Sequence, residues 1–127
     1  MRASLPDLEP FYPGLTSGQI AHAIMKLGPA MVLLTDEDRL AHAYSRAGNA
    51  SRPVEPVQVI DTVGAGDTFV AAALWWLAGR SIVSREQIAL LQGNELQDLL
   101  SKAMGAAALT CQRKGADPPW RGEMAGL

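Results

Sequence analysis

Apolar positions near the start of the chain repeat at the spacing of a helix. Thr16 and Gln19 match a capping box, in which a hydroxyl side chain and the side chain three residues later satisfy each other's backbone amides. Ile20 begins the apolar face that follows, and Gly28, followed by a proline, ends the pattern. We therefore expect a helix here, preceded by an extended lead-in over residues 1–15, which carry three prolines.

Three further segments before residue 61 have the length or pattern of strands. Residues 30–35 are continuously apolar up to a threonine, as in a parallel strand covered on both faces. Residues 40–44 alternate between alanines and larger polar side chains, which predicts a short edge strand. Residues 46–56 contain Gly, Asn and Pro and are expected to form a loop, whereas residues 57–60 form a short apolar strand.

The second half of the chain predicts three helices. Residues 69–77 are apolar on every side, a pattern typical of a helix that is buried all round, and Gly79 ends it. Ser84 and Gln87 match a second capping box. The last helix ends at Gly115 and carries one apolar stripe, which comprises Leu96, Leu99, Leu100, Ala103, Ala107 and Cys111.

Strands interleaved with helices are typical of a layered α/β fold. The pattern predicts a sheet of about three or four strands, whereas a doubly wound sheet normally has five or more. Too little sequence is available to cover the apolar helix 69–77 completely. The chain is therefore expected to be a piece of a larger fold, or to need a partner.

Composition and charge exclude several classes of protein. The 127 residues have a net charge of −2 and no basic runs, which argues against a nucleic-acid partner. The single cysteine, Cys111, excludes an intramolecular disulfide and favours a reducing cytoplasm; its place on the apolar stripe suggests a small core residue. No apolar run is long enough to span a bilayer, and the first residues do not resemble a signal peptide, so no membrane partner is expected.

Residues 61–69, of sequence DTVGAGDTF, carry the candidate chemistry. A strand, a glycine-rich turn and a helix N-terminus together make an anion site, because the amides of the first helical turn are unpaired and the helix dipole adds positive potential. Gly64 and Gly66 allow a phosphate to approach the backbone closely. Asp67 does not help to hold a phosphate, but it suits a base that takes a proton from a hydroxyl attacking that phosphate.

The same motif is compatible with other interpretations. Phe69 stands where a dinucleotide fingerprint has its third glycine, so an oxidoreductase domain is disfavoured. No Gly-Lys-Ser/Thr follows, so the motif is not a Walker A loop. A plain structural reading stays open, in which the glycines make a tight turn and Asp67 is a first-turn acid that favours the helix dipole. His22 and His42 show no catalytic pattern and are interpreted as structural or solvated.

Residues 61–67 resemble the C-terminal signature of the ribokinase-like, phosphofructokinase-B type carbohydrate kinases. Residues 106–120 resemble the closing segment of fructokinase-like members from bacteria. The resemblance extends over about residues 18–122. It implies that residues 16–127 are the C-terminal portion of a carbohydrate kinase domain with a ribokinase-like, Rossmann-type layered α/β fold. The implied function is ATP-dependent phosphorylation of a fructose-like sugar.

The resemblance also implies roles for individual residues. Asp67 is the catalytic base, and the Gly64–Gly66 turn, with Ala65 at its centre, supplies amides to the transferring phosphoryl group. Thr35 and Met104 occupy positions that contact ATP in the family, while Asp61 matches a residue that helps to bind a monovalent cation such as K⁺ in some members. ATP and Mg²⁺ are the implied cofactors.

Three features depart from the family pattern. Members are about twice as long or longer, and the half that supplies most sugar contacts is absent here. The family usually has Thr-x-Gly-x-x-Gly where this chain has Thr35 followed by the acids of residues 36–38, which would repel a polyphosphate unless they turn to solvent. Met104 replaces an asparagine that many members have near the adenine.

Because of these departures, two alternatives to an active kinase stay open. One is an inactive nucleotide- or phosphate-binding remnant, and the other is an interaction fragment that pairs strands with another chain. The expected partners are a sugar, ATP, and either a missing N-terminal half or a second copy of this chain.

Overall fold

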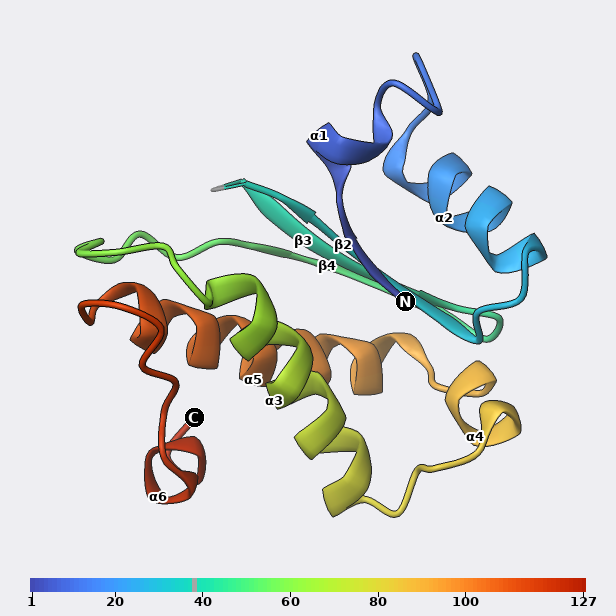
Figure 1. Cartoon of the computed structure of the whole chain (residues 1–127). Coiled ribbons are helices and arrows are strands. Elements are labelled where there is room, and N and C mark those ends of the chain that lie inside the picture. The colour runs from blue at the N-terminus through green and yellow to red at the C-terminus, as the bar shows by residue number, and fades with distance from the viewer. Residues whose placement is uncertain (38) are drawn as a thin grey trace.

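The computed structural model describes residues 1–37 and 39–127, in which a four-stranded sheet carries helices on both faces (Figure 1). The strands are β1 (Arg2–Ser4), β2 (Met31–Asp36), β3 (Leu40–Ser45) and β4 (Asn49–Pro53). The helices described are α1 (Leu5–Leu8), α2 (Ser17–Lys26), α3 (Ala65–Gly79), α4 (Arg85–Ala89), α5 (Gly93–Cys111) and α6 (Arg121–Met124). The predicted α/β class, with three or four strands, is confirmed.

The strands lie side by side in the order β1-β2-β3-β4, with β1 parallel to β2 and the other neighbours antiparallel. β3 therefore lies inside the sheet, and the prediction that it forms an edge was wrong. The loop predicted over residues 46–56 was also wrong in part, because Asn49–Pro53 pairs with β3 as the true edge strand. A polar strand ending in proline is tolerated at an edge, where an outward amide needs no partner.

The N-terminal lead-in contributes regular structure rather than only an extended segment. Arg2–Ser4 adds a parallel strand to β2, and Pro6 lies in the first turn of the short helix α1. A proline is tolerated there because the first amides of a helix have no internal acceptor. Three residues are too short to show a strand pattern, so this strand becomes visible only through its pairing with β2.

The strand predicted over residues 57–60 is absent from the described structure, and this segment is irregular. Instead of pairing with a strand, the amides of Ile60 and Asp61 donate to the carbonyl of Cys111, at 2.8 and 3.2 Å. That carbonyl belongs to the last turn of α5, where carbonyl groups lack partners within the helix. The apolar side chains gave the segment a strand-like pattern, but no neighbouring strand is available to it.

Each face of the sheet has its own apolar core (Figure 1). Val32 and Leu34 of β2 pack against α2, while Met31 and Leu33 face α3 and α5. Because side chains alternate along a strand, the continuous apolar run of β2 supplies both cores, as the sequence predicted. Both capping boxes predicted at Thr16 and Ser84 are present.

α3 is buried on one side only, which corrects the prediction that it is buried all round. Phe69 and Trp76 belong to the core with α5, but Leu74 is 60% exposed and Trp75 is 42% exposed. The indole N–H (Nε1) of Trp76 donates to Asp98 Oδ2 at 2.7 Å, which fixes the position of α3 along α5. The outer face of the helix is thus apolar and largely exposed, and Trp75 lines a shallow hollow together with Pro118 and Met124 of the C-terminal segment.

α5 ends at Cys111, four residues before the predicted end at Gly115. Its buried stripe includes Leu96, Leu99, Leu100 and Ala103, as predicted, and continues through Ala106 and Thr110. Ala107 and Cys111 are only half-buried because they face a cavity. None of the described helices is long and apolar enough to cross a bilayer.

His42 lies on the α2 side of the sheet with 7% of its surface exposed. Its Nδ1 is 2.7 Å from the hydroxyl of Ser51, and its ring stacks on Tyr44 at a centroid distance of 6.2 Å. Burial lowers the pKa of His42, and the negative charge of Asp36 offsets part of that effect. The structural reading of His42 agrees with this packing.

We expect the free energy of unfolding to fall as the pH drops below the ordinary histidine pKa of about 6.5. In that range the unfolded chain binds a proton on His42, whereas the folded chain binds it only at lower pH. Urea denaturation across this pH range measures the slope, which His42→Gln should reduce. His22→Gln, at an exposed position, is the matched control, and an equal slope in wild type and His42→Gln would contradict the prediction.

Candidate functional site

The glycine-rich turn lies where residues 61–64 enter α3. Gly64 caps the helix with a left-handed φ of 80°, and a Cβ on it would lie 2.9 Å from Cβ of Ala116. Only glycine meets both conditions without strain. The amide of Ala65 donates to the carbonyl of Thr62 at 3.2 Å, and that of Thr68 donates to Gly64 at 2.8 Å. Between them, the amide of Gly66 lies in the first turn, where helix amides have no internal acceptor.

Asp67 also lies in the first turn of α3, and its side chain is exposed to solvent. Its carboxylate makes no hydrogen bond or ion pair with the residues that the structure describes. The free carboxylate is therefore accessible to a hydroxyl from outside the chain. Its assignment as a catalytic base remains a prediction.

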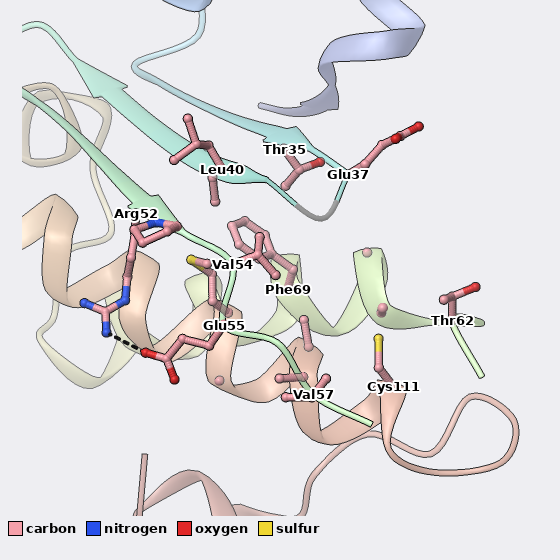
Figure 2. Close-up of a pocket in the computed structure, with 18 of the residues that line it drawn as sticks. Thr35, Glu37, Leu40, Arg52, Val54, Glu55, Val57, Thr62, Phe69 and Cys111 are labelled. Carbon is pink, nitrogen blue, oxygen red and sulfur yellow. Dashed lines mark hydrogen bonds and ion pairs between the residues drawn. The ribbon is translucent and has the colours of Figure 1, made fainter. Parts of the chain in front are cut away.

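A cavity of about 910 Å³ opens beside this turn, between the sheet and the two long helices (Figure 2). It brings together four of the predicted site positions, namely Thr35, Ala65, Gly66 and Met104. Gly64, Asp67 and Asp61 do not line it. Elements far apart in the chain, β2, α3 and α5, thus meet around one hollow.

Thr35 ends the buried part of β2 and is half-buried at the cavity wall. Its hydroxyl accepts a hydrogen bond from Nη2 of Arg2 at 2.9 Å. Of the acids that follow, Asp36 is half-buried and Glu37 is exposed with a left-handed φ of 45°, while Asp38 lies outside the described residues. Glu37 lines the cavity, and Figure 2 shows its carboxylate on the outer side of the lining residues that are drawn.

Asp61 fastens two loops together through its carboxylate. Oδ1 accepts the amide of Val63 at 3.0 Å, and Oδ2 accepts the amide of Gly115 at 3.0 Å. These backbone bonds, that of Val63 first and that of Gly115 second, lower the pKa of Asp61. The geometry supports the tie-down reading of Asp61, and its role towards a monovalent cation remains a prediction.

The cavity and the residues around it are compatible with the implied cofactors, ATP and Mg²⁺. Small-molecule sites have volumes of roughly 300–1,000 Å³, a range that includes this cavity. The described residues contain no group of three or more His, Cys, Asp or Glu side chains that could hold a metal. Mg²⁺ in phosphoryl-transfer sites is usually held by one or two carboxylates together with the phosphates, so such a cage is not required.

The lining residues that were not recognised from the sequence include Cys111 and Arg2. Cys111 was expected in the core, but it is half-buried on the cavity wall near Val57 (Figure 2). Arg2 was placed in the lead-in, yet it lies at the cavity beside Thr35. The signal for Arg2 is the pairing of β1 with β2, which a three-residue strand does not reveal.

The comparisons with known proteins agree with this geometry. A family model described as "pfkB family carbohydrate kinase" matches residues 7–121. Fructokinase-1 from Oryza sativa subsp. japonica is 37% identical over 121 residues, which are 93% of this chain and 35% of that protein. A fructokinase from Rhizobium leguminosarum bv. trifolii is 35% identical over 71 residues, or 56% of this chain and 22% of that protein. The chain thus spans about a third or less of these curated relatives.

Solved structures share the fold. Ribokinase from Thermotoga maritima has a TM-score of 0.75 at 22% identity, and the match covers 98% of this chain and 40% of that protein. A fructokinase from Vibrio cholerae O395, in a form bound to fructose, ADP and potassium ion, has a TM-score of 0.74 at 22% identity, covering 98% and 39%. The ribokinase-like fold and the resemblance drawn from the sequence are therefore confirmed.

The tight fit of Gly64 makes a direct prediction about stability. Gly64→Ala should lower the free energy of unfolding by about 2 kcal/mol, because it combines a left-handed backbone with a contact to Ala116. The matched control is Gly79→Ala at the last residue of α3, where a Cβ meets nothing within 4 Å and should be neutral or slightly stabilising. Urea denaturation measures both; equal effects of the two substitutions would contradict the strained-turn account.

Proposed function

Because the chain belongs to the pfkB family of carbohydrate kinases, we propose that it carries the phosphoryl-transfer part of an ATP-dependent kinase for a fructose-like sugar. The observation that carries this proposal is the Gly64–Gly66 turn, which places the N-terminus of a 15-residue helix at the mouth of the cavity. The curated relatives described above are fructokinases, which supports a ketose as the acceptor. The match covers only part of each relative, so the activity belongs to the complete kinase.

The turn suits the charge that develops during the reaction. Transfer of a phosphoryl group requires stabilisation of negative charge on its oxygens more than any covalent help from the protein. First-turn amides of α3 and the positive end of its dipole supply that stabilisation without rearrangement. ATP would place its phosphates at Gly66 and its base towards Met104, with Thr35 on the wall between them.

Asp67 would take the proton from the sugar hydroxyl. The hydroxyl oxygen then forms a bond to the γ-phosphorus, the bond from that phosphorus to the bridging oxygen breaks, and ADP leaves with the electron pair. Mg²⁺, held mainly by the phosphates, would offset the charge on the leaving oxygens. The exposed, unpaired carboxylate of Asp67 is suited to this role, because no described residue competes for its lone pairs.

The direct test joins residues 1–127 to the N-terminal part of the rice relative and measures ADP release with fructose and MgATP. We expect fructose-dependent turnover, which Asp67→Asn reduces by about 10²–10⁴-fold while MgATP still binds, because only the proton transfer is lost. The 127-residue chain alone should bind MgATP saturably and release little ADP, since no sugar contacts are assigned to it.

Two results would count against this function. Turnover that is unaffected by Asp67→Asn would contradict the assignment of Asp67 as the catalytic base. A wild-type chain with no saturable ATP binding would favour the alternative of an inactive remnant. Circular dichroism of the variant shows whether a loss of turnover reflects misfolding.

One set of observations favours the second candidate, an interaction fragment. β1 pairs with β2 alone among the described strands, and an unpaired strand edge is a template for another chain. The outer face of α3 adds the exposed side chains of Leu74 and Trp75.

This candidate predicts that the purified chain associates at micromolar concentration. Size-exclusion chromatography with light scattering should detect the association, and Trp75→Glu should weaken it by placing a charge on the apolar face. Val83→Glu, at a more exposed apolar position outside α3, is the control. A monomer at all concentrations would argue against this candidate.

A further inference from the structure

The guanidinium group of Arg2 lies between two parts of the candidate site. On one side, Nη2 donates to the hydroxyl of Thr35 at 2.9 Å. On the other side, a Cβ on Gly66 would lie 3.2 Å from Nη1 and 3.4 Å from both Cζ and Nη2. The side chain that closely approaches this glycine is therefore a cation.

The topology explains why Arg2 reaches this place. β1 runs parallel to β2, with Arg2 opposite Leu33 and Ser4 opposite Thr35. Leu33 faces α3 and α5, so Arg2 points to the same side of the sheet. The carboxyl ends of neighbouring parallel strands and a helix N-terminus meet here, which is where open α/β sheets bind their ligands.

Glu37 and Glu55 line the same cavity, but neither forms an ion pair with Arg2 in the described part of the chain. A guanidinium group has five N–H donors, and among the described residues Arg2 makes one side-chain hydrogen bond and no ion pair. The group it faces is the N-terminus of α3, whose dipole is also positive. Two positive sources that meet with no carboxylate paired directly to either favour an anion bound between them.

We propose that Arg2 is a nucleotide-binding residue that contacts the phosphate chain of ATP from the side opposite the Gly64–Gly66 turn. This rests on the proposed function, because it assigns the same cavity to ATP. Arg2 keeps its bond to Thr35 through Nη2 and turns the donors of Nη1, the atom nearest Gly66, to the phosphate oxygens. Planar, forked donors suit phosphate better than the single ammonium group of lysine.

The test compares the affinities of the 127-residue chain for MgATP and for adenosine by isothermal titration calorimetry. Arg2→Gln should weaken MgATP binding about tenfold, the loss of one charge-assisted contact, and leave adenosine binding unchanged. The MgATP affinity of Arg2→Lys should lie between those of the wild type and Arg2→Gln. If Arg2→Gln folds poorly, the comparison of Arg2→Lys with the wild type tests the same prediction. Arg46→Gln, which removes the same charge in the exposed turn between β3 and β4, should leave both affinities unchanged.

Alkylation of Cys111 gives a second readout of the same site. It is the only cysteine of the chain and lines the cavity, so bound MgATP should slow its reaction with iodoacetamide. In Arg2→Gln, about tenfold more MgATP should be needed for the same protection.

The outcomes separate this proposal from the proposed function. Equal MgATP affinity in wild type and Arg2→Gln would overturn the role of Arg2 and leave the kinase proposal standing. Parallel weakening of adenosine binding would also overturn it, because the role would then be structural. A wild-type chain that binds no MgATP would overturn both.

Discussion

The position of the glycine-rich turn depends on how the loop before α3 is fastened to the segment after α5. Asp61 joins the two by accepting the amides of Val63 and Gly115 on separate oxygens. Directly beside this tie, Gly64 packs against Ala116, and the buried hydroxyl of Thr110 donates to that of Thr68 at 3.0 Å. Charge-assisted and buried polar bonds of this kind are directional, so they define the register of α3 on α5 more sharply than apolar contacts do. The direction of the first-turn amides follows from that register.

How well each part of the fold could be predicted depends on whether its cause is local. The capping boxes at Thr16 and Ser84 are contained within four residues each, and β2 shows its burial in its own apolar run. β1 and β4 owe their strand conformation to pairing with neighbours, and their sequences are short or polar. Residues 57–60 are the reverse case, because apolar side chains suggest a strand where no partner strand exists. Patterns of side chains report burial, whereas strand pairing depends on residues elsewhere in the chain.

The residues of the candidate site likewise divide into those with a local sequence signal and those without one. The turn from Gly64 to Asp67 is a continuous stretch, and its glycines, acid and following helix were all recognisable from sequence. Cys111 was assigned to the core because the stripe of α5 contains it, yet the stripe turns towards the cavity in the last helical turn. Arg2 carries no local signal of its role. Its place beside Gly66 results from the parallel pairing of β1 with β2, which joins residues 33 positions apart in hydrogen bonding.

The charges around the cavity bear on the departure from the family pattern after Thr35. Glu37 stands where the family pattern has its first glycine and Asp36 precedes it, and carboxylates there would repel a polyphosphate at the end of β2. At a separation of 4 Å, two unit charges interact by about 1 kcal/mol in water and about 4 kcal/mol at the lower effective dielectric near a protein surface. Glu37 and Arg2 are both exposed and both line the cavity, so the interactions of both fall near the lower value, but the Arg2 guanidinium lies beside Gly66. The balance favours a phosphate chain placed towards Gly66, away from the acids. The acidic turn alone is therefore weak evidence for an inactive remnant.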